Sequence, residues 1–332
     1  MLAFCYKKIY LWKNLIRLTF IQNKIMTKVL VATEKPFAQE AVEGIKHIVE
    51  KAGFTCILLE SYTSKQQLLD AVVDVDAVII RSDIVDKEVV DAAKNLKIVV
   101  RAGAGYDNID LDACSAKGIV AMNTPGQNAN AVAELVFGMM IFFARVSFSG
   151  KSGTELRGKT FGIHAFGNIG RIVAKIAKGF GMNVYAFDPF VSHDVIEKEG
   201  VTSLSSVGEL YKTCQYVSLH IPATEKTIKS INYNLLSMMP KDAVLVNTAR
   251  KEVINEDDML KLMAERKDFS YIADVRPSKD AEFEEKFAGR VLFTAKKTGA
   301  QTEEANINAG LAAANQIVGF INKGDKTFQV NK

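Results

Sequence analysis

Residues 158–188 read GKTFGIHAFGNIGRIVAKIAKGFGMNVYAFD, and this stretch decides the fold. An apolar strand is followed by a turn, a helix and a second strand that ends in an acid. The helix repeats apolar residues with a period of 3.6, which predicts one buried face, at Ile169, Ile172, Val173, Ile176, Ala177 and Phe180. Gly181 then marks its end. This order predicts a crossover unit of a parallel α/β sheet.

The turn of this unit keeps part of a dinucleotide-binding fingerprint. Gly167 and Gly170 stand at its last two glycine positions, and Asp188 stands where a ribose-binding acid is expected. A glycine lets the backbone approach a pyrophosphate, and the next helix offers free N–H groups to that anion. Because an Asp repels a 2′-phosphate, the pattern predicts NAD rather than NADP. Ala165 replaces the first glycine, and we expect it to require an ordinary negative φ.

The composition is that of an ordinary globular protein with room for two domains. The chain has 332 residues, of which 48% are apolar and 24% charged. Its net charge of +4 is spread along the chain, so it indicates neither a nucleic acid nor a membrane as partner. The four cysteines form no CxxC pair, which predicts reduced thiols in the cytoplasm. The four histidines form no cluster of metal ligands, so we expect no metal site.

Residues 1–26 differ from the rest of the chain. They carry five Lys or Arg and no acid, and those cations interrupt the apolar runs, so the segment is not expected to span a bilayer. A basic, acid-free segment is typical of a transit peptide. The simpler alternative is an upstream start, with the folded protein beginning near Met26. We favour that alternative and expect this extension to take no part in the fold.

From residue 28 onward, strand-like runs alternate with helical patterns, which predicts two doubly wound parallel sheets. The runs are 28–33, 55–60, 76–82, 97–103 and 118–123, then 159–166, 183–188, 216–222, 243–250, 270–275 and 290–295. We expect a flavodoxin-like substrate domain over 27–123 plus 303–332 and a Rossmann NAD-binding domain over 124–302. The last helical stretch, 302–324, is expected to return to the first domain, with the active cleft between the two domains.

Two further runs can carry chemistry. In RAGAGYDNID (101–110), Gly103 and Gly105 can turn their N–H groups inward as an anion-binding nest, or can simply form a tight turn. In NTAR (247–250), Arg250 follows a strand at its carboxyl edge, where ligands bind in open α/β sheets. An Arg there can hold a carboxylate by two parallel hydrogen bonds, or can merely cap its strand.

Together these motifs resemble the D-2-hydroxyacid dehydrogenase family, most closely its members that act on 3-phosphoglycerate. The matching runs span 27–332 in the family's order: RAGAGYDNID, NTPGQNANAVAELV, ELRGKTFGI with AFGNIGR, VSLHIP, VNTARKEVINEDDML, ADV and GAQTEEA. The resemblance implies NAD-dependent oxidation of D-3-phosphoglycerate to 3-phosphohydroxypyruvate, a step of serine biosynthesis. It also implies a homodimer built around the NAD domain.

The resemblance assigns residues to the site. The substrate carboxylate would meet Arg250 and the backbone at 103–105, while Arg81 and Ser82, with Lys35 as a second cation, would lie near a distal phosphate. The expected substrate residues are Lys35, Arg81, Ser82, Gly103, Ala104 and Gly105. The expected cofactor residues are Gly167, Asn168, Ile169, Gly170, Asp188, His220, Pro222, Thr248, Ala249, Asp274 and Gly299. Asp274 would contact the nicotinamide carboxamide, and His220 with Pro222 would border the adenosine.

The chain departs from the family at the acid–base residue. The family places a catalytic His in TPHxG, but no His follows His220 here, and the corresponding segment is TAKKTGAQT. Counting from Thr294 puts Lys296 at the His position, whereas counting back from Gly299 puts Lys297 there. The family's paired Glu is also replaced, because Lys279 stands five residues after Asp274.

A lysine can take over the proton transfer if its pKa falls. The unperturbed value is about 10.4, and a nearby carboxylate would raise it further. Loss of the Glu and a second neighbouring ammonium both lower the pKa, and a buried Lys reaches about 7–8. We therefore expect Lys296 or Lys297 to exchange the proton with the substrate oxygen.

Other features and rival functions remain. The linker ARVSFSGKSG is shorter than in many relatives, and the chain ends soon after its last helix, so no regulatory domain is expected. One rival function is the same chemistry on another D-2-hydroxyacid, such as glycerate, glyoxylate or lactate. Another is an NAD-sensing binding protein without catalysis, like the C-terminal-binding corepressors that share this fold.

Overall fold

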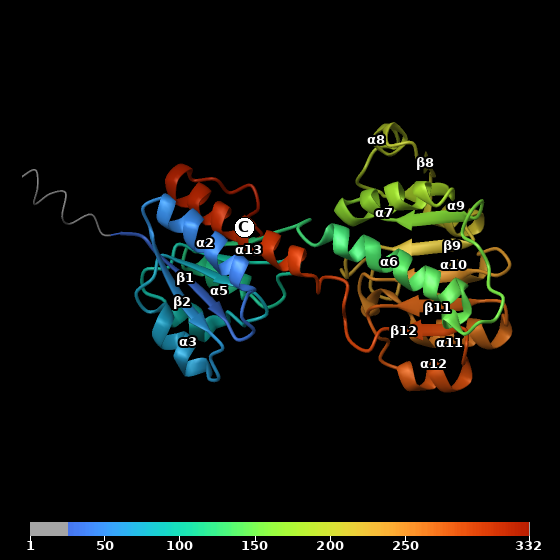
Figure 1. The fold of residues 1–332 in the computed structure, drawn as a ribbon, viewed down its shortest axis with the longest axis horizontal. Helices are drawn as coiled ribbons and strands as arrows, with labels where there is room; N and C mark the ends of the chain where they lie inside the picture. The colour runs from blue at the N-terminus through green and yellow to red at the C-terminus, as the bar shows by residue number, and fades with distance from the viewer. Residues whose placement is uncertain (1–25, 332) are drawn as a thin grey trace, which may run out of the picture. The chain divides into compact units, whose positions relative to one another are not determined.

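The computed structural model describes residues 26–331 (Figure 1). The extension expected to stay out of the fold therefore lies outside the described residues, except for Met26. The chain divides into two compact units. The first runs to Thr124 and resumes at Gly310, and the second is Pro125–Ala309.

The first unit is built on a five-stranded parallel sheet in the order β2-β1-β3-β4-β5. Its elements are β1 (Lys28–Thr33), α2 (Gln39–Lys51), β2 (Thr55–Glu60), α3 (Lys65–Val72), β3 (Ala77–Ile80), α4 (Lys87–Ala92), β4 (Ile98–Arg101), α5 (Leu111–Ala116) and β5 (Val120–Asn123). This strand order is the flavodoxin-like one, as the sequence predicts. Strands β3, β4 and β5 are apolar runs buried on both faces, as expected where helices cover both sides of a sheet.

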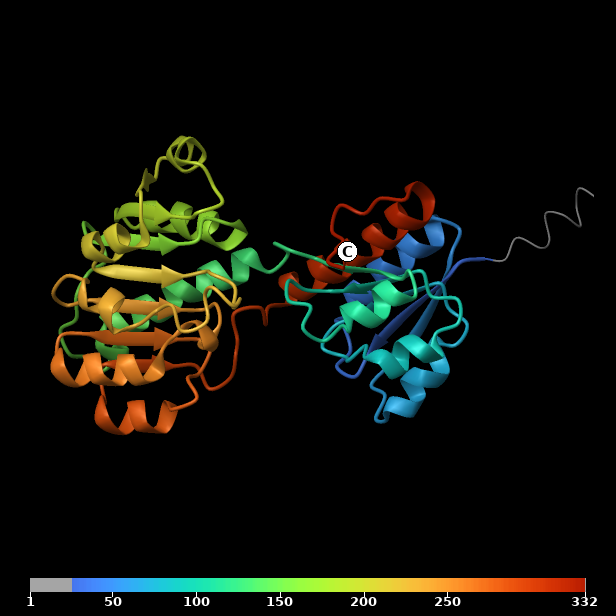
Figure 2. The same cartoon turned by 180° about the vertical axis from the view of Figure 1, so that it is seen from behind.

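The end of the chain completes the first unit. Helix α13 (Glu303–Lys323) lies beside α2 in both views (Figures 1 and 2), and a methyl group added at Gly310 would sit 2.9 Å from the Ile45 side chain. After α13, the backbone of Val330 donates to Ala121 of β5, and the amide of Asn331 both accepts from Ala121 N–H and donates to Ile119. The last helix returns to the first unit from Gly310 onward, whereas the sequence places this boundary at residue 303.

The second unit is built on a seven-stranded parallel sheet in the order β12-β11-β10-β9-β6-β7-β8. Its elements before α13 are α6 (Ala129–Ala144), η1 (Val146–Phe148), β6 (Thr160–His164), α7 (Asn168–Gly179), β7 (Asn183–Phe187), α8 (His193–Lys198), β8 (Thr202–Ser203), α9 (Val207–Thr213), β9 (Tyr216–Leu219), α10 (Tyr233–Ser237), β10 (Val244–Asn247), η2 (Lys251–Val253), α11 (Glu256–Glu265), β11 (Ser270–Ala273), α12 (Asp280–Lys286) and β12 (Val291–Phe293).

Strand β6 is the switch point of this second sheet. Strands β7 and β8 lie on one side of β6 in the sheet, and β9 to β12 lie on the other. Ligands bind beside such a point, outside the carboxyl ends of the strands. The predicted Rossmann arrangement is confirmed, and the structure adds the short strand β8, which the sequence pattern does not single out.

Helix α7 forms where the 3.6-residue pattern predicts. It buries Val173 and Ala177 in a core shared with α6, and Phe137 of α6 stacks on Phe180 with ring centroids 5.2 Å apart. Phe180 itself stays 37% exposed. The helix ends at Gly179, and Gly181 follows in the left-handed region with φ of 70°, as its place in the sequence indicates.

Within residues 26–331, no helix has the length and apolar character needed to cross a membrane. The same part of the chain holds no group of three or more His, Cys, Asp or Glu side chains placed to bind a metal ion.

Candidate active site

The turn between β6 and α7 is held by the end of β7. The N–H of Ala165 donates to the carbonyl of Phe187 at 2.9 Å, and the N–H of Phe166 donates to the Asp188 carboxylate at 2.8 Å. These bonds place Ala165 at φ of 84°. The expectation of a negative φ there is therefore wrong: the residue keeps the left-handed geometry of the glycine it replaces, at a cost of roughly 1–2 kcal/mol.

The two retained glycines do different things. A Cβ at Gly170 would lie 2.4 Å from the carbonyl oxygen of Ala165, so only glycine lets α7 approach this turn. A Cβ at Gly167 would meet nothing within 4 Å, so the backbone there faces open space at the start of α7. The neighbouring Asn168 side chain packs against Gly126, and Ile169 packs against the core. This arrangement fits the close approach of a pyrophosphate to a helix N-terminus.

Asp188 is fixed in position by the backbone. One carboxylate oxygen accepts from Phe166 N–H and the other from Phe190 N–H, both at 2.8 Å. Each carboxylate oxygen can accept a further hydrogen bond. The position therefore fits the acceptor role toward ribose hydroxyls that the sequence predicts.

Polar atoms without partners are buried at the carboxyl ends of β9 and β10. The Nδ1 atom of His220 and the hydroxyl of Thr248 have no hydrogen-bond partner in residues 26–331. These residues directly follow the paired positions Leu219 and Asn247 of neighbouring strands. Buried polar groups are normally satisfied, so these two atoms fit hydrogen bonds to a cofactor.

Two histidines near this edge are neutral. Burial lowers the pKa of His220 to about 3, and the imidazole of His164 nearby adds to that effect. Burial likewise lowers the pKa of His164 to about 4. The Ser218 hydroxyl lies 3.0 Å from His220 Nε2, which fixes the ring. His220 therefore offers a neutral hydrogen-bonding ring rather than a cation.

Arg250 is placed by a fully buried amide. The side chain of Asn247 donates to the Arg250 carbonyl and accepts from the Ala249 N–H, both at 3.0 Å. The half-buried guanidinium donates through Nη1 to the Ala249 carbonyl at 2.9 Å. Since a guanidinium has five N–H donors in a fork, it can still bind a carboxylate.

Asp274 holds the turn that carries the two candidate lysines. Its carboxylate, only 1% exposed, accepts from Thr298 N–H at 2.7 Å, Gly299 N–H at 2.8 Å and the Thr294 hydroxyl at 2.9 Å. The Asp274 carboxylate thus already accepts three hydrogen bonds from its own chain. Its predicted interaction with the nicotinamide carboxamide stays a prediction. The side chains of Lys296 and Lys297 are exposed, so the burial of a lysine that we expect is not what the structure shows.

Lys279, which the resemblance puts in place of the family's Glu, turns toward helix α11. Its ammonium pairs with Asp257, and that hydrogen bond raises the pKa of Lys279. The backbone N–H groups of Ser278 and Lys279 donate to the two oxygens of Glu256, at 2.7 and 3.0 Å. Glu256 was not singled out by the sequence. Glu256 lies in the first turn of a helix, and nothing in the local sequence indicates its hydrogen bond with Ser278, 22 positions later.

In the first unit, Arg81 meets the backbone of Lys35 rather than its ammonium. The Arg81 Nη1 atom donates to the carbonyls of Lys35 and Pro36 at 3.1 and 3.0 Å, and the guanidinium lies 5.0 Å from the Phe37 ring centroid. Burial lowers the pKa of Arg81. The neighbouring Ser82 and the Lys35 side chain are exposed. The structure thus brings the Arg81 guanidinium to the backbone at Lys35 and does not show the two cationic groups in contact.

The glycine loop after β4 differs from the expected nest. Gly103 has φ of 155°, and its N–H donates to the Arg101 carbonyl at 2.9 Å. The prediction that this N–H is available to an anion is therefore wrong. A Cβ at Gly103 would sit 1.8 Å from the Arg101 guanidinium, which lies over the loop. Within the described residues, the N–H groups of Ala104 and Gly105 donate to no other group. Of the three predicted residues, Ala104 and Gly105 therefore remain as the candidate anion-binding pair.

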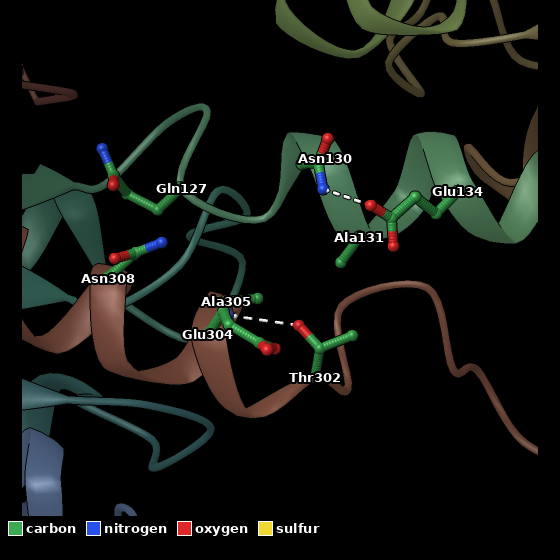
Figure 3. Close-up of a pocket in the computed structure, with 8 residues that line it drawn as sticks. All are labelled: Gln127, Asn130, Ala131, Glu134, Thr302, Glu304, Ala305 and Asn308. Atoms are coloured by element: carbon green, nitrogen blue, oxygen red, sulfur yellow. Dashed lines mark hydrogen bonds between the residues drawn. The ribbon is translucent and has the colours of Figure 1, made fainter. Parts of the chain in front are cut away.

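Two cavities in the second unit lie apart from the predicted residues. One encloses about 220 Å³ between the first turns of α6 and α13 and is lined by polar side chains that include Gln127, Asn130, Glu134 and Thr302 (Figure 3). In it, the Asn130 amide donates to Glu134 at 2.6 Å. The other encloses about 300 Å³ and is lined in part by Lys229, Lys251 and Lys279. Neither contains a residue expected to bind NAD or substrate.

Comparison with known proteins gives matches to one enzyme family. Residues 118–295 match the model of the D-isomer specific 2-hydroxyacid dehydrogenase NAD-binding domain. The structure of NAD+-bound 3-phosphoglycerate dehydrogenase from Entamoeba histolytica superposes with a TM-score of 0.83 at 46% identity, over 92% of this chain and 99% of that one.

Curated relatives point the same way. D-3-phosphoglycerate dehydrogenase of Methanocaldococcus jannaschii is 34% identical over 88% of this chain, and the match covers only 57% of that longer protein. Hydroxypyruvate reductase of Thermotoga maritima is 32% identical over 88% of this chain and 98% of that one. The chain thus belongs to the D-isomer specific 2-hydroxyacid dehydrogenase family and carries that family's NAD-binding domain.

Proposed function

We propose that the protein catalyses the NAD-dependent oxidation of D-3-phosphoglycerate to 3-phosphohydroxypyruvate, the step that the resemblance assigns to serine biosynthesis. The observation that carries the proposal is the match at 46% identity to a 3-phosphoglycerate dehydrogenase over 99% of that chain. The reaction balances as substrate and NAD+ giving the keto acid, NADH and one proton. The widely spaced thiols favour the cytoplasm as its location.

In the second unit, the residues around β6, β9 and β10 would hold the cofactor. Bound NAD+ supplies the hydride acceptor for carbon 2 of the substrate. Gly167 leaves room for the pyrophosphate, Asp188 accepts from the ribose, and His220 and Thr248 hold polar atoms that need partners. Arg250 would orient the substrate carboxylate through its guanidinium fork.

In the first unit, the N–H groups of Ala104 and Gly105 would receive a substrate oxyanion. The cations Arg81 and Lys35 suit a substrate with a phosphate at its far end. This charge favours a phosphorylated 2-hydroxyacid over an unphosphorylated one.

A lysine would handle the proton. Either Lys296 or Lys297 takes the hydroxyl proton during oxidation and returns it during reduction. Support comes from the turn that bears them, because Asp274 fixes its backbone at Thr298 and Gly299. A fixed turn sets the point from which either lysine side chain can reach the substrate hydroxyl, as general acid–base catalysis requires.

The decisive experiment measures NADH consumption with 3-phosphohydroxypyruvate for the parent protein and for Lys296→Met and Lys297→Met. One variant should lose about 10²–10⁴ in kcat, and the other should retain most of its activity. Full activity in both variants contradicts the role of the lysines. An inactive parent that still binds NADH would instead favour the NAD-sensing binding protein.

A second candidate is a reductase for an unphosphorylated 2-hydroxyacid. The observation in its favour is the hydroxypyruvate reductase of Thermotoga maritima, which matches over 98% of its length. The ratio of kcat/KM for 3-phosphohydroxypyruvate to that for hydroxypyruvate or glyoxylate decides between them. A ratio well above one supports the phosphorylated substrate.

We also propose a homodimer built around the NAD-binding unit, on the basis of the family resemblance. Light scattering on a size-exclusion column should give twice the chain mass of 36.5 kDa. A tetramer or a monomer would contradict it.

A further inference from the structure

A buried carboxylate in the first unit joins loops that the sequence does not connect. Asp83, 4% exposed, follows β3. Its Oδ1 atom accepts from Glu34 N–H and from the Tyr62 hydroxyl, both at 2.7 Å, and its Oδ2 atom accepts from Arg81 N–H at 3.0 Å. Three donors from the ends of three strands thus converge on one side chain.

These loops border the switch point of the first sheet. Strand β1 lies between β2 and β3 in the sheet. The chain therefore runs from β1 to β2 on one side and from β3 to β4 on the other. Glu34 follows β1 and Arg81 follows β3. In open α/β sheets, ligands bind in the crevice at this place. Asp83 therefore ties together the two sides of the position where the first unit is expected to bind a ligand.

A second set of bonds fixes the same turn from β4. The Asn108 side chain donates to the carbonyls of Asp83 and Arg81 at 2.6 and 3.2 Å. The Nε atom of Arg101 donates to the Arg81 carbonyl at 3.0 Å. From the other side, the Arg81 guanidinium holds the carbonyls of Lys35 and Pro36. Arg81 is thus held by its backbone carbonyl from the β4 side and by its guanidinium from the loop after β1.

Asp83 acts through other groups because it is buried and its carboxylate already accepts three hydrogen bonds from its own chain. A buried carboxylate is stable only where hydrogen bonds replace its lost hydration, and here three donors do so. Burial, together with the hydrogen bond to Asp83, raises the pKa of Tyr62, so the phenol remains a donor. An anionic ligand would be repelled by Asp83 and would have to bind to the groups that Asp83 positions.

We propose that Asp83 is a positioning residue that sets the substrate specificity of the first unit. It holds loops 34–37 and 81–83 so that Arg81 and Lys35 stay in place for the distal anionic group of the substrate. This inference rests on the proposed function. It predicts that Asp83 controls the preference for a phosphorylated over an unphosphorylated keto acid, without affecting the cofactor.

Three variants isolate the effect. Asp83→Asn keeps the shape but has one acceptor oxygen instead of two, so at least one of the three donors loses its partner. Tyr62→Phe removes one donor and leaves the carboxylate. Asp110→Asn is the matched control, because Asp110 caps α5 by accepting from Ala113 N–H, and an Asn caps a helix equally well.

The test measures kcat and KM for 3-phosphohydroxypyruvate and for hydroxypyruvate, together with the Kd of NADH. We expect Asp83→Asn to raise KM for the phosphorylated substrate by about tenfold or more, with a change of less than about twofold for hydroxypyruvate. Tyr62→Phe should show a smaller rise, and Asp110→Asn none. The Kd of NADH and kcat should stay near those of the parent.

The outcomes separate the inference from the proposed function. If the parent is active but Asp83→Asn raises both KM values equally, or neither, the positioning role is overturned. If the parent turns over neither keto acid, the proposed function falls and the specificity role falls with it. Hydrogen exchange gives a readout that needs no activity: the amides of Glu34 and Arg81 should lose protection in Asp83→Asn but not in Asp110→Asn. Unchanged protection would overturn the anchoring itself.

Discussion

The carboxylate of Asp274 accepts the backbone N–H of Thr298 at 2.7 Å, and through this bond the end of β11 fixes the turn that bears both candidate lysines. The same carboxylate accepts the Thr294 hydroxyl at 2.9 Å. A charged acceptor in a buried place forms stronger hydrogen bonds than a neutral one. The turn is therefore fixed to the sheet by one side chain.

Removing one of these donors should loosen the turn. We predict that Thr294→Val lowers kcat by about fivefold to tenfold, because a buried carboxylate loses a hydrogen bond worth about 1–1.5 kcal/mol. Thr294→Ser restores the hydroxyl and should restore the rate. Steady-state kinetics with NADH and 3-phosphohydroxypyruvate measure both variants. Equal rates in the two variants would show that the hydroxyl does not support the turn.

The left-handed residue Ala165 should be a source of strain. We predict that Ala165→Gly raises the free energy of unfolding by about 0.5–1 kcal/mol, because glycine adopts φ near 84° without the steric penalty of a methyl group. Urea denaturation measures the change. The control Ala174→Gly, in the interior of α7, should lower stability. A loss of stability in Ala165→Gly would contradict the strain.

The two fingerprint glycines should respond differently to alanine. Gly170→Ala is expected to cost about 1–3 kcal/mol of stability, because its methyl group would lie 2.4 Å from the Ala165 carbonyl oxygen. Gly167→Ala has room for its methyl group and should leave stability nearly unchanged while weakening NAD binding. Thermal unfolding and NADH fluorescence titration separate the two effects. Equal losses of stability would be inconsistent with this geometry.

Buried histidines should make the protein sensitive to acid. His164 has a pKa of about 4 and His220 of about 3, both below the unfolded value of about 6.5. Between those values the unfolded chain binds more protons than the folded one, so stability is fully present above pH 6.5 and falls toward pH 4. The loss should reach a few kcal/mol.

Urea unfolding at pH 7, 5.5 and 4.5 measures this loss. The variant His164→Gln removes one titrating group and should show a shallower decline with acidification than the parent protein. An identical slope in the two proteins would show that His164 does not contribute.

Local patterns predicted the frame of the molecule well. The strand-like runs and the 3.6-residue period of α7 depend on neighbouring residues, and they locate both sheets and the crossover around Gly170. The predicted location of Asp188 beside the turn at Phe166 also follows from the strand–turn–helix order.

Long-range bonds account for what the sequence did not predict. The φ of Ala165 is set by Phe187, which comes from the next strand. The bond from Glu34 to Asp83 joins residues 49 positions apart, and no periodic pattern marks such a pair. The N–H of Gly103 donates to the Arg101 carbonyl, which leaves only Ala104 and Gly105 as candidates for anion binding in this loop. An acid shortly after a buried strand was the available signal for Asp83.

The membership of α13 in both units has a consequence for how the chain is made. The second unit is contiguous, whereas the first needs Gly310 onward, where the Gln316 amide donates to the Asn123 carbonyl and Asn331 bonds to the backbone beside β5. During synthesis the amino-terminal sheet therefore emerges first from the ribosome but is completed last. Until the whole cofactor-binding unit has been translated, the backbone N–H and C=O groups at the β5 edge lack these partners and can pair with other chains.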